Sequence, residues 1–210
     1  MRRLILKMSV SLDGFVAGPN GEIDWMLRGR DEAARDWTVD TLRQAGLHAM
    51  GSRTYFDMAA YWPTSTEAFA APMNEIPKIV FTRQKSLDLG AGRTTNALRD
   101  AREAQEEIAS SPSQDAASWA EAEVANGDLT TEIERLKSQP GKDILAHGGA
   151  GFAQSLAAAD LVDEYRLLVH PVALGSGLSL FGALPKPLDL ELRASSLFRS
   201  GVAAHVYRPA

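Results

Sequence analysis

Four small residues between an apolar stretch and a helical pattern form the sharpest chemical feature of the sequence. They are Gly148, Gly149, Ala150 and Gly151. The apolar stretch 143–147 predicts a strand before them, and the composition of 152–159 predicts a helix after them. Bare backbone N–H groups at a helix start carry partial positive charge and attract a pyrophosphate. The same residues could equally form a tight turn that needs glycine for positive φ, and they do not match the Gly-x-Gly-x-x-Gly fingerprint of a Rossmann domain.

Two further apolar stretches are followed by groups that can bind phosphate. The stretch 47–50 leads into Gly51, Ser52, Arg53 and Thr54, and the stretch 78–82 ends in Thr82 and Arg83. A guanidinium and hydroxyls suit a phosphate better than an apolar ligand, although a single arginine is more commonly a solvated surface residue. Ligands of open α/β sheets bind at the carboxyl ends of the strands. Three strand ends with phosphate-compatible groups therefore favour a nucleotide site.

The elements that must position these groups alternate between strand and helix. Strands are predicted at 4–10, 47–50, 78–82, 143–147 and 164–172, and helices at 31–45, which would end at Gly46, and after 51–54 up to Pro63. The stretches 188–198 and 202–207, joined by a turn at Ser200-Gly201, predict an antiparallel hairpin. The pattern predicts an α/β fold with a mainly parallel sheet and an antiparallel C-terminal edge.

Composition limits the function. The 210 residues are 45% hydrophobic and 23% charged, which predicts one globular domain over 1–210. A net charge of −5 disfavours nucleic acid, and the absence of cysteine excludes thiolate chemistry. The four histidines lack metal-ligand spacing, so no metal is expected. The apolar run at 4–6 is too short for a signal or a membrane span, and a cytosolic protein is expected. Residues 101–125 are interpreted as an exposed helix plus a flexible surface insertion around 85–118.

The motifs together resemble a known family, the reductase domain of the bacterial bifunctional deaminase-reductase of riboflavin synthesis and its stand-alone relatives. The resemblance extends over nearly the whole chain apart from 85–118, and it rests on the following segments: 9–17 (SVSLDGFVA), 50–55 (MGSRTY), 80–83 (VFTR), 143–150 (DILAHGGA), 161–165 (LVDEY) and 170–177 (HPVALGSG). It implies a three-layer fold like that of dihydrofolate reductase, with helices on both faces of the sheet, and the use of NADPH. It also implies a homodimer, for which the terminal hairpin could supply an interface.

The resemblance assigns roles to individual residues. Ser52, Arg53 and Thr54 would hold cofactor phosphates, Thr82 and Arg83 the adenosine side, and Gly148 to Gly151 the pyrophosphate. Asp13 would lie near the substrate, where a carboxylate could orient an amide edge or relay a proton, although Asp-Gly is also a common turn pair. Trp25 could be a pocket aromatic or a core residue.

These expectations define the functional hypothesis and its rivals. The chain is expected to be an oxidoreductase in which NADPH passes hydride to a small planar heterocycle, pterin-like or pyrimidine-like, or to a conjugated carbonyl. One rival is a nucleotide-binding or regulatory module without turnover. The other is the riboflavin-pathway reductase proper, which acts on a ribosylated, phosphorylated pyrimidine and needs a second anion site. The deaminase half of the riboflavin enzyme is absent, and no carboxylate can be placed where dihydrofolate reductases protonate a pterin.

Overall fold

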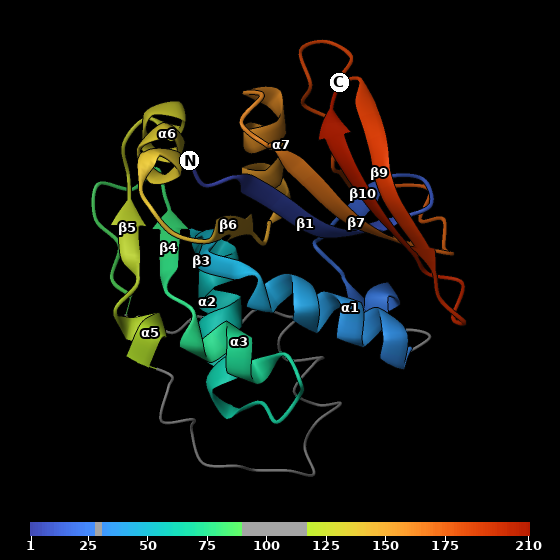
Figure 1. Cartoon of the computed structure of the whole chain (residues 1–210), viewed down its shortest axis with the longest axis horizontal. Coiled ribbons are helices and arrows are strands. Elements are labelled where there is room, and N and C mark those ends of the chain that lie inside the picture. The colour runs from blue at the N-terminus through green and yellow to red at the C-terminus, as the bar shows by residue number, and fades with distance from the viewer. Residues whose placement is uncertain (28–30, 90–116) are drawn as a thin grey trace.

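The computed structural model of the chain describes residues 1–27, 31–89 and 117–210. Its centre is an eight-stranded sheet in the order β5-β4-β3-β6-β1-β7-β10-β9 (Figure 1). The six strands from β5 to β7 are parallel, and β10 and β9 extend the sheet as an antiparallel hairpin. The strands are β1 Leu4–Ser11, β3 Ala45–Gly51, β4 Lys78–Phe81, β5 Glu123–Ala125, β6 Asp143–Ala146, β7 Glu164–His170, β9 Leu190–Leu197 and β10 Ala203–Pro209. The predicted mainly parallel sheet with an antiparallel C-terminal edge is confirmed.

Helices lie on both faces of this sheet, because the strands are apolar on both sides. In β1, Leu4 and Leu6 belong to one core with residues of α6 and α7, whereas Ile5 belongs to another with residues of α1, α2 and α3. The helices are α1 Glu32–Arg43, α2 Ser52–Tyr61, α3 Ala70–Glu75, α5 Ala117–Ala120, α6 Leu129–Ser138 and α7 Ala150–Ala158, with short 3-10 helices η1 Asp24–Leu27 and η2 Trp62–Thr64. No helix within the described ranges is long and apolar enough to cross a membrane.

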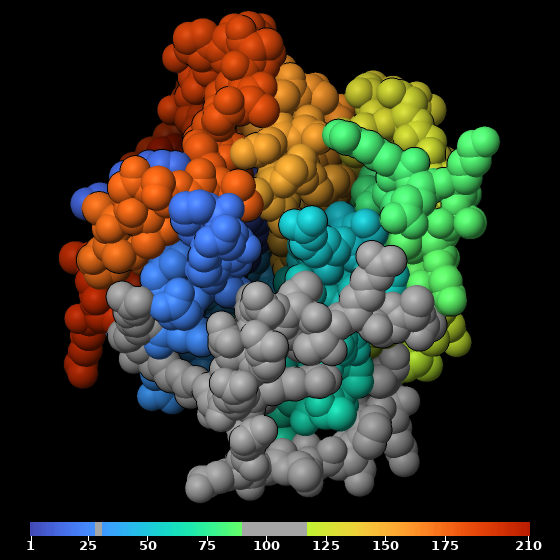
Figure 2. Space-filling view, turned by 180° about the vertical axis from the view of Figure 1, so that it is seen from behind, coloured from blue at the N-terminus to red at the C-terminus, as the bar shows by residue number. Residues whose placement is uncertain are grey.

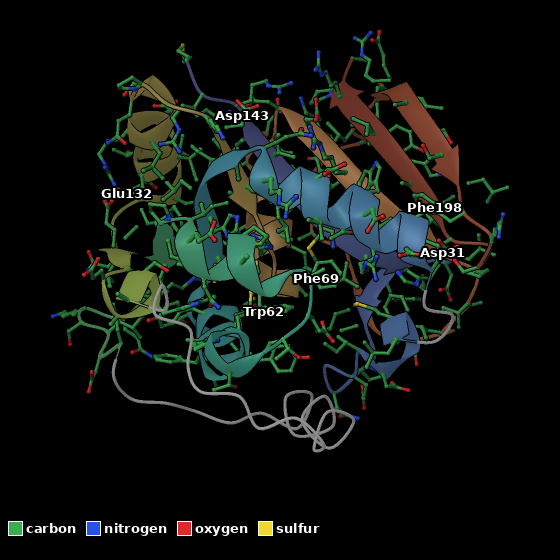
Figure 3. All side chains as sticks on the ribbon, turned by 60° about the horizontal axis from the view of Figure 1, so that its bottom comes forward. Asp31, Trp62, Phe69, Glu132, Asp143 and Phe198 are labelled. Carbon is green, nitrogen blue, oxygen red and sulfur yellow. The ribbon has the colours of Figure 1, made fainter. Side chains whose placement is uncertain are left out.

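A small second sheet and the side chain that caps α1 hold loops next to the main sheet. The strands β2 Phe15–Ala17 and β8 Leu178–Ser179 pair antiparallel beyond the end of β1. Asp31 caps α1 by accepting from the N–H groups of Ala33 and Ala34, and its other oxygen accepts from the N–H of Ser200 at 2.9 Å. Figure 3 shows Asp31 beside Phe198, where the helix start meets the β9–β10 turn. The same view shows Trp62 and Phe69, whose rings pack edge to face.

The structure corrects the predicted end of the first helix. α1 ends at Arg43 rather than at Gly46, and Gly46 lies inside β3 where the pairing with β6 shifts register. A Cβ at position 46 would lie 2.9 Å from the Cβ of Lys142. Gly46 therefore serves the close approach of β3 to the chain before β6, not the termination of a helix.

The second correction concerns the end of the segment 101–125. Residues 90–116, which contain most of the predicted insertion, lie outside the described residues. Residues 117–125 are not an exposed helix: Trp119 of α5 is 4% exposed and donates to Asn74 Oδ1 at 2.8 Å, and the following residues pair as β5 with β4. Leu87 and Leu89, at the end of the described range 31–89, pack against the same core.

Candidate functional site

The loops that follow β3 and β6 meet at the carboxyl edge of the sheet. The N–H of Gly149 donates to Thr54 Oγ1 at 2.6 Å, and the N–H of His147 donates to the carbonyl of Ala49 at 2.9 Å. The first of these hydrogen bonds directly joins the two predicted phosphate-binding segments, 51–54 and 148–151, which are almost one hundred residues apart in the sequence. The loops are linked because β3 and β6 are parallel neighbours in the sheet.

Two helices start at this junction without side-chain caps. α2 begins at Ser52 after Gly51, and α7 begins at Ala150 after Gly149; neither glycine can cap the helix with a side chain. The first N–H groups of a helix need acceptors, and an anion can supply them. The arrangement can therefore hold a diphosphate between two helix starts.

Glycine is required at some of these positions and not at others. Gly148 has φ of +82°, and a Cβ there would lie 2.8 Å from Met8 Sδ. A Cβ at Gly149, whose peptide bond with Gly148 is cis, would lie 2.9 Å from Thr54 Oγ1. A Cβ at Gly151 meets no atom within 4 Å. The tight-turn interpretation thus applies to Gly148, and the open space at Gly151 leaves room for a ligand.

Thr82 and Arg83 lie at the same edge, at the end of β4. The N–H of Thr82 donates to the carbonyl of Ala125 at 3.0 Å, and Thr82 Oγ1 accepts from the N–H of Gln84. Arg53 and Arg83 are exposed and make no ion pair with any described residue. Their cofactor contacts remain predictions.

Lys7 is a buried residue near the candidate site, on the strand beside β6, and the sequence interpretation missed it. It lies in the middle of β1, on the face covered by α1, and protein atoms surround its amine although the residue keeps a small contact with solvent. Burial lowers the pKa of Lys7 to about 8. Burial lowers the pKa values of His147 and His170, which stand at the ends of the two neighbouring strands, and the charge of Lys7 adds to this effect. A lysine inside an apolar strand was the signal that could have identified it.

Two further basic side chains extend this group under α1 and α2. His48 of β3 is fully buried, and its ring lies 4.5 Å from the ring of His147, edge to face. Burial, with the charge of Lys78, lowers the pKa of His48 to about 3. Lys78 donates to the carbonyls of Asn74 and Ile76, and burial lowers its pKa to about 7. The charged neighbours that shift these histidines are all basic, so the group formed by Lys7, His48, Lys78 and His147 favours an oxygen-rich or anionic neighbour.

Asp13 holds the loop after β7 in place. Its carboxylate accepts from Ser11 Oγ at 2.6 Å, from the N–H of Gly175 at 2.8 Å and from the N–H of Leu174 at 3.1 Å. The bond from Ser11, followed by those from the backbone, lowers the pKa of Asp13 to about 2. The structure thus gives Asp13 a connecting role, and its contact with substrate remains a prediction.

Trp25 of η1 is packed inside the protein rather than open to solvent. It is 3% exposed, its Nε1 donates to the carbonyl of Glu22 at 3.3 Å, and its ring meets the ring of His170 edge to face at 5.2 Å. Through His170, the ring supports the carboxyl end of β7, which pairs with Ser11 of β1.

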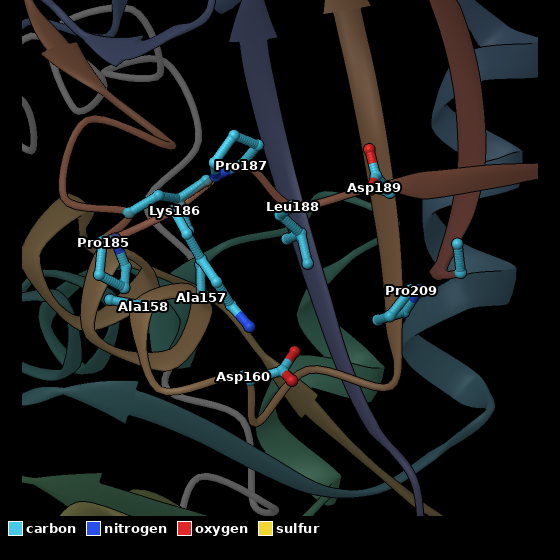
Figure 4. A pocket seen from close by; sticks show the side chains of 11 residues that line it. Ala157, Ala158, Asp160, Pro185, Lys186, Pro187, Leu188, Asp189 and Pro209 are labelled. Carbon is cyan, nitrogen blue, oxygen red and sulfur yellow. The ribbon is translucent and has the colours of Figure 1, made fainter.

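The molecular surface is hollowed where the loops of the candidate site meet. Figure 2 shows a hollow between the blue N-terminal segment, the cyan segment that begins α2 and the amber segment that leads into α7. A second depression, a cavity of about 210 Å³, lies at the opposite, amino edge of the sheet (Figure 4). Asp160, Lys186 and Pro209 line it, together with the C-terminus. The strand-end loops do not contribute to that cavity, so it is separate from the site.

Comparisons with known proteins agree with the fold. The model of the RibD C-terminal domain matches residues 2–204. The uncharacterized protein YyaP of Bacillus subtilis is 31% identical over 206 residues, which are 98% of this chain and 94% of that protein. The riboflavin biosynthesis protein RibD of Corynebacterium ammoniagenes is 25% identical over 91% of this chain, which spans 48% of that longer protein.

A solved structure shows the same fold. The bifunctional diaminohydroxyphosphoribosylaminopyrimidine deaminase and 5-amino-6-(5-phosphoribosylamino)uracil reductase of Thermotoga maritima superposes with a TM-score of 0.64 at 16% identity. The match covers 100% of this chain and 57% of the Thermotoga chain.

Proposed function

From the premise that this chain belongs to the RibD C-terminal domain family, we propose that it is an NADPH-dependent reductase of a small planar acceptor, pterin-like or pyrimidine-like or a conjugated carbonyl. The observation that carries the proposal is the hydrogen bond between the Gly149 N–H and Thr54 Oγ1, which joins two uncapped helix starts at the carboxyl edge of the sheet. RibD-like relatives and structural neighbours are reductases by name, which supports the reaction class.

The residues present fit a dinucleotide phosphate. The Gly148–Gly151 loop offers backbone N–H groups and, at Gly151, free space for close approach. Arg53 and Arg83 provide cations without protein partners among the described residues, and a guanidinium beside a ribose 2′-phosphate is a physical reason to prefer NADPH over NADH. When bound, NADPH supplies the hydride; the protein binds and orients it.

Lys7 supports the choice of acceptor. Its amine lies on the central strand, between His147 and His170 in the sheet order, and burial lowers its pKa to about 8. A group with this pKa can donate a proton near neutral pH to an atom that gains negative charge after hydride addition. A carbonyl oxygen or ring nitrogen facing Lys7 fits this position, whereas a protonated amidine edge would face a cation and be repelled.

The test is a calorimetric titration with NADPH and with NADH. We expect NADPH to bind at least tenfold more tightly, a difference of about 1.4 kcal/mol, and Arg83→Ala to remove that difference. Arg53→Ala should weaken both nucleotides. Arg43→Ala, on the exposed last turn of α1, is the matched control and should leave both affinities unchanged.

The outcomes separate the proposal from its rivals. If neither nucleotide binds, the reductase proposal is wrong even though the fold is that of the family. If NADPH binds but no pterin, pyrimidine or conjugated carbonyl oxidises it, a nucleotide-binding or regulatory module is the better assignment. Turnover confined to a phosphoribosylated aminopyrimidine would identify the riboflavin-pathway reductase proper.

A further inference from the structure

The cavity at the amino edge of the sheet has the size and lining of a site for a small molecule. Its volume is about 210 Å³, and it lies where the C-terminal end of α7 meets the segment between β8 and β9 (Figure 4). Sites that enclose drug-sized ligands span about 300–1,000 Å³, so a smaller molecule fits here. The apolar part of the wall includes Ala157 and Ala158 of α7, together with Pro185, Pro187 and Leu188. The cavity can therefore enclose a short aliphatic group.

Two opposite charges face this apolar space without pairing with each other. Figure 4 shows the side chain of Lys186 reaching across the cavity toward Asp160. Neither side chain forms an ion pair with any residue in the described ranges. Asp189 also lines the cavity, but Figure 4 shows its carboxylate pointing away from Asp160 and Lys186. The cavity thus offers one anion and one cation to a ligand between them.

The position of Asp160 favours a cation beside its carboxylate. The residue comes just after the end of α7 at Ala158. The C-terminal end of a helix carries partial negative charge, which repels a carboxylate and attracts a cation. The charge of Asp160 also reaches Tyr165 of β7, where it adds to the effect of burial and raises the pKa of the hydroxyl to about 12. A ligand ammonium at Asp160 would compensate negative charge from both the helix and the carboxylate.

We propose that this cavity binds a free α-amino acid with an aliphatic side chain. The ligand ammonium would pair with Asp160, the ligand carboxylate would pair with Lys186, and the aliphatic group would lie against Leu188 and the alanines of α7. A simple carboxylate would satisfy Lys186 and leave Asp160 without a cation, and a simple amine would do the reverse. The proposal does not depend on the reductase activity, because the cavity and the candidate site lie at opposite edges of the sheet.

The experiment is an NMR titration of the isotope-labelled protein with L-leucine. We expect a dissociation constant of about 1 mM and shifts in the amide signals of Ala157, Asp160 and Leu188. Two control ligands each lack one charge of leucine: isocaproate lacks the ammonium, and isoamylamine lacks the carboxylate. Both should bind at least tenfold more weakly than leucine, because each loses one charge-assisted hydrogen-bonded pair.

Two variants identify which protein group holds which end of the ligand. Asp160→Asn should weaken leucine and isoamylamine at least tenfold and leave isocaproate unchanged. Lys186→Met should weaken leucine and isocaproate at least tenfold and leave isoamylamine unchanged. Lys142→Met, which removes another exposed lysine just before β6, is the matched control and should leave all three affinities unchanged.

Each other result overturns the proposal. If leucine shifts no signal at ten times the expected dissociation constant, Lys186 and Asp160 are charges of the surface and not a binding pair. Shifts confined to the loops after β3 and β6 would place leucine in the candidate site. If isoamylamine binds as tightly as leucine, or if Lys186→Met binds leucine as the wild type does, Lys186 takes no part and the zwitterion is the wrong ligand class.

Discussion

Gly148 lies in the loop after β6 and Gly151 in the first turn of α7, and the structure predicts opposite effects when each is changed to alanine. Gly148→Ala forces a side chain into φ of +82°, which costs about 1–2 kcal/mol. The new Cβ also lies 2.8 Å from Met8 Sδ, the flexible end of a side chain, which adds about 1 kcal/mol. We therefore expect a loss of about 2–3 kcal/mol of unfolding free energy.

Gly151→Ala serves as the matched control, because it adds the same methyl group in open space within α7. Replacing a helical glycine by alanine should stabilise by about 0.5–1 kcal/mol. Urea unfolding followed by circular dichroism measures both changes, and a slope of about 2–3 kcal/mol per molar predicts a midpoint about 1 M lower for Gly148→Ala. A Gly148→Ala midpoint equal to that of wild type would refute the steric argument.

Four further predictions follow from buried or bonded side chains. Lys7→Met should leave NADPH affinity unchanged and lower the hydride-transfer rate at least tenfold. Because burial moves the pKa of Lys7 from 10.5 to about 8, the unfolding free energy of the wild type should rise between pH 8 and 10.5. The variant should not show that rise in urea unfolding. His48→Gln should reduce the loss of stability in urea unfolding as the pH falls from 6.5 to about 3, because the folded pKa of His48 is depressed and protonation favours unfolding. Asp13→Asn should speed proteolytic cleavage within 172–177, where two N–H groups lose a charged acceptor, and an unchanged cleavage rate would contradict the connecting role. Glu164→Gln should lower the unfolding free energy by about 3 kcal/mol, since three arginines lose a buried carboxylate, and NADPH titration should show no change.

The sequence predicted the strands with a simple apolar pattern and the loops with glycine or hydroxyl residues. β1, β4, β6 and the terminal hairpin follow their predicted ranges closely, because continuous burial on both faces gives continuous apolar runs. α6 and the short β2, β5 and β8 were not identified. Strands of two or three residues carry too little pattern, and their formation depends on partners distant in sequence.

Part of the candidate site could be inferred from the sequence, and the part that could not has a physical explanation. Glycines and hydroxyls indicate a candidate phosphate loop through backbone geometry, which is local. Lys7, His48 and His147 form a group only because the strand order places β1, β6 and β3 side by side, and sequence spacing does not contain that order. Asp13 illustrates the converse. Its carboxylate was interpreted as a group that acts on the substrate, but in the structure it accepts hydrogen bonds from the backbone N–H groups of Leu174 and Gly175, which lie 161 and 162 residues later in the sequence.

Glu164 connects three strands at the amino edge of the sheet. Its side chain is 3% exposed and pairs with Arg3 of the chain before β1, Arg166 of β7 and Arg208 of β10. The groups that stabilise the sheet and those that we propose to contact ligands are thus concentrated at opposite ends of the same strands. Substitutions in the loops after β1, β3 and β6 can therefore accumulate during evolution without loosening this connection. Proteins with this fold can therefore change the residues that bind a hydride acceptor and keep the ion pairs that hold the strands together.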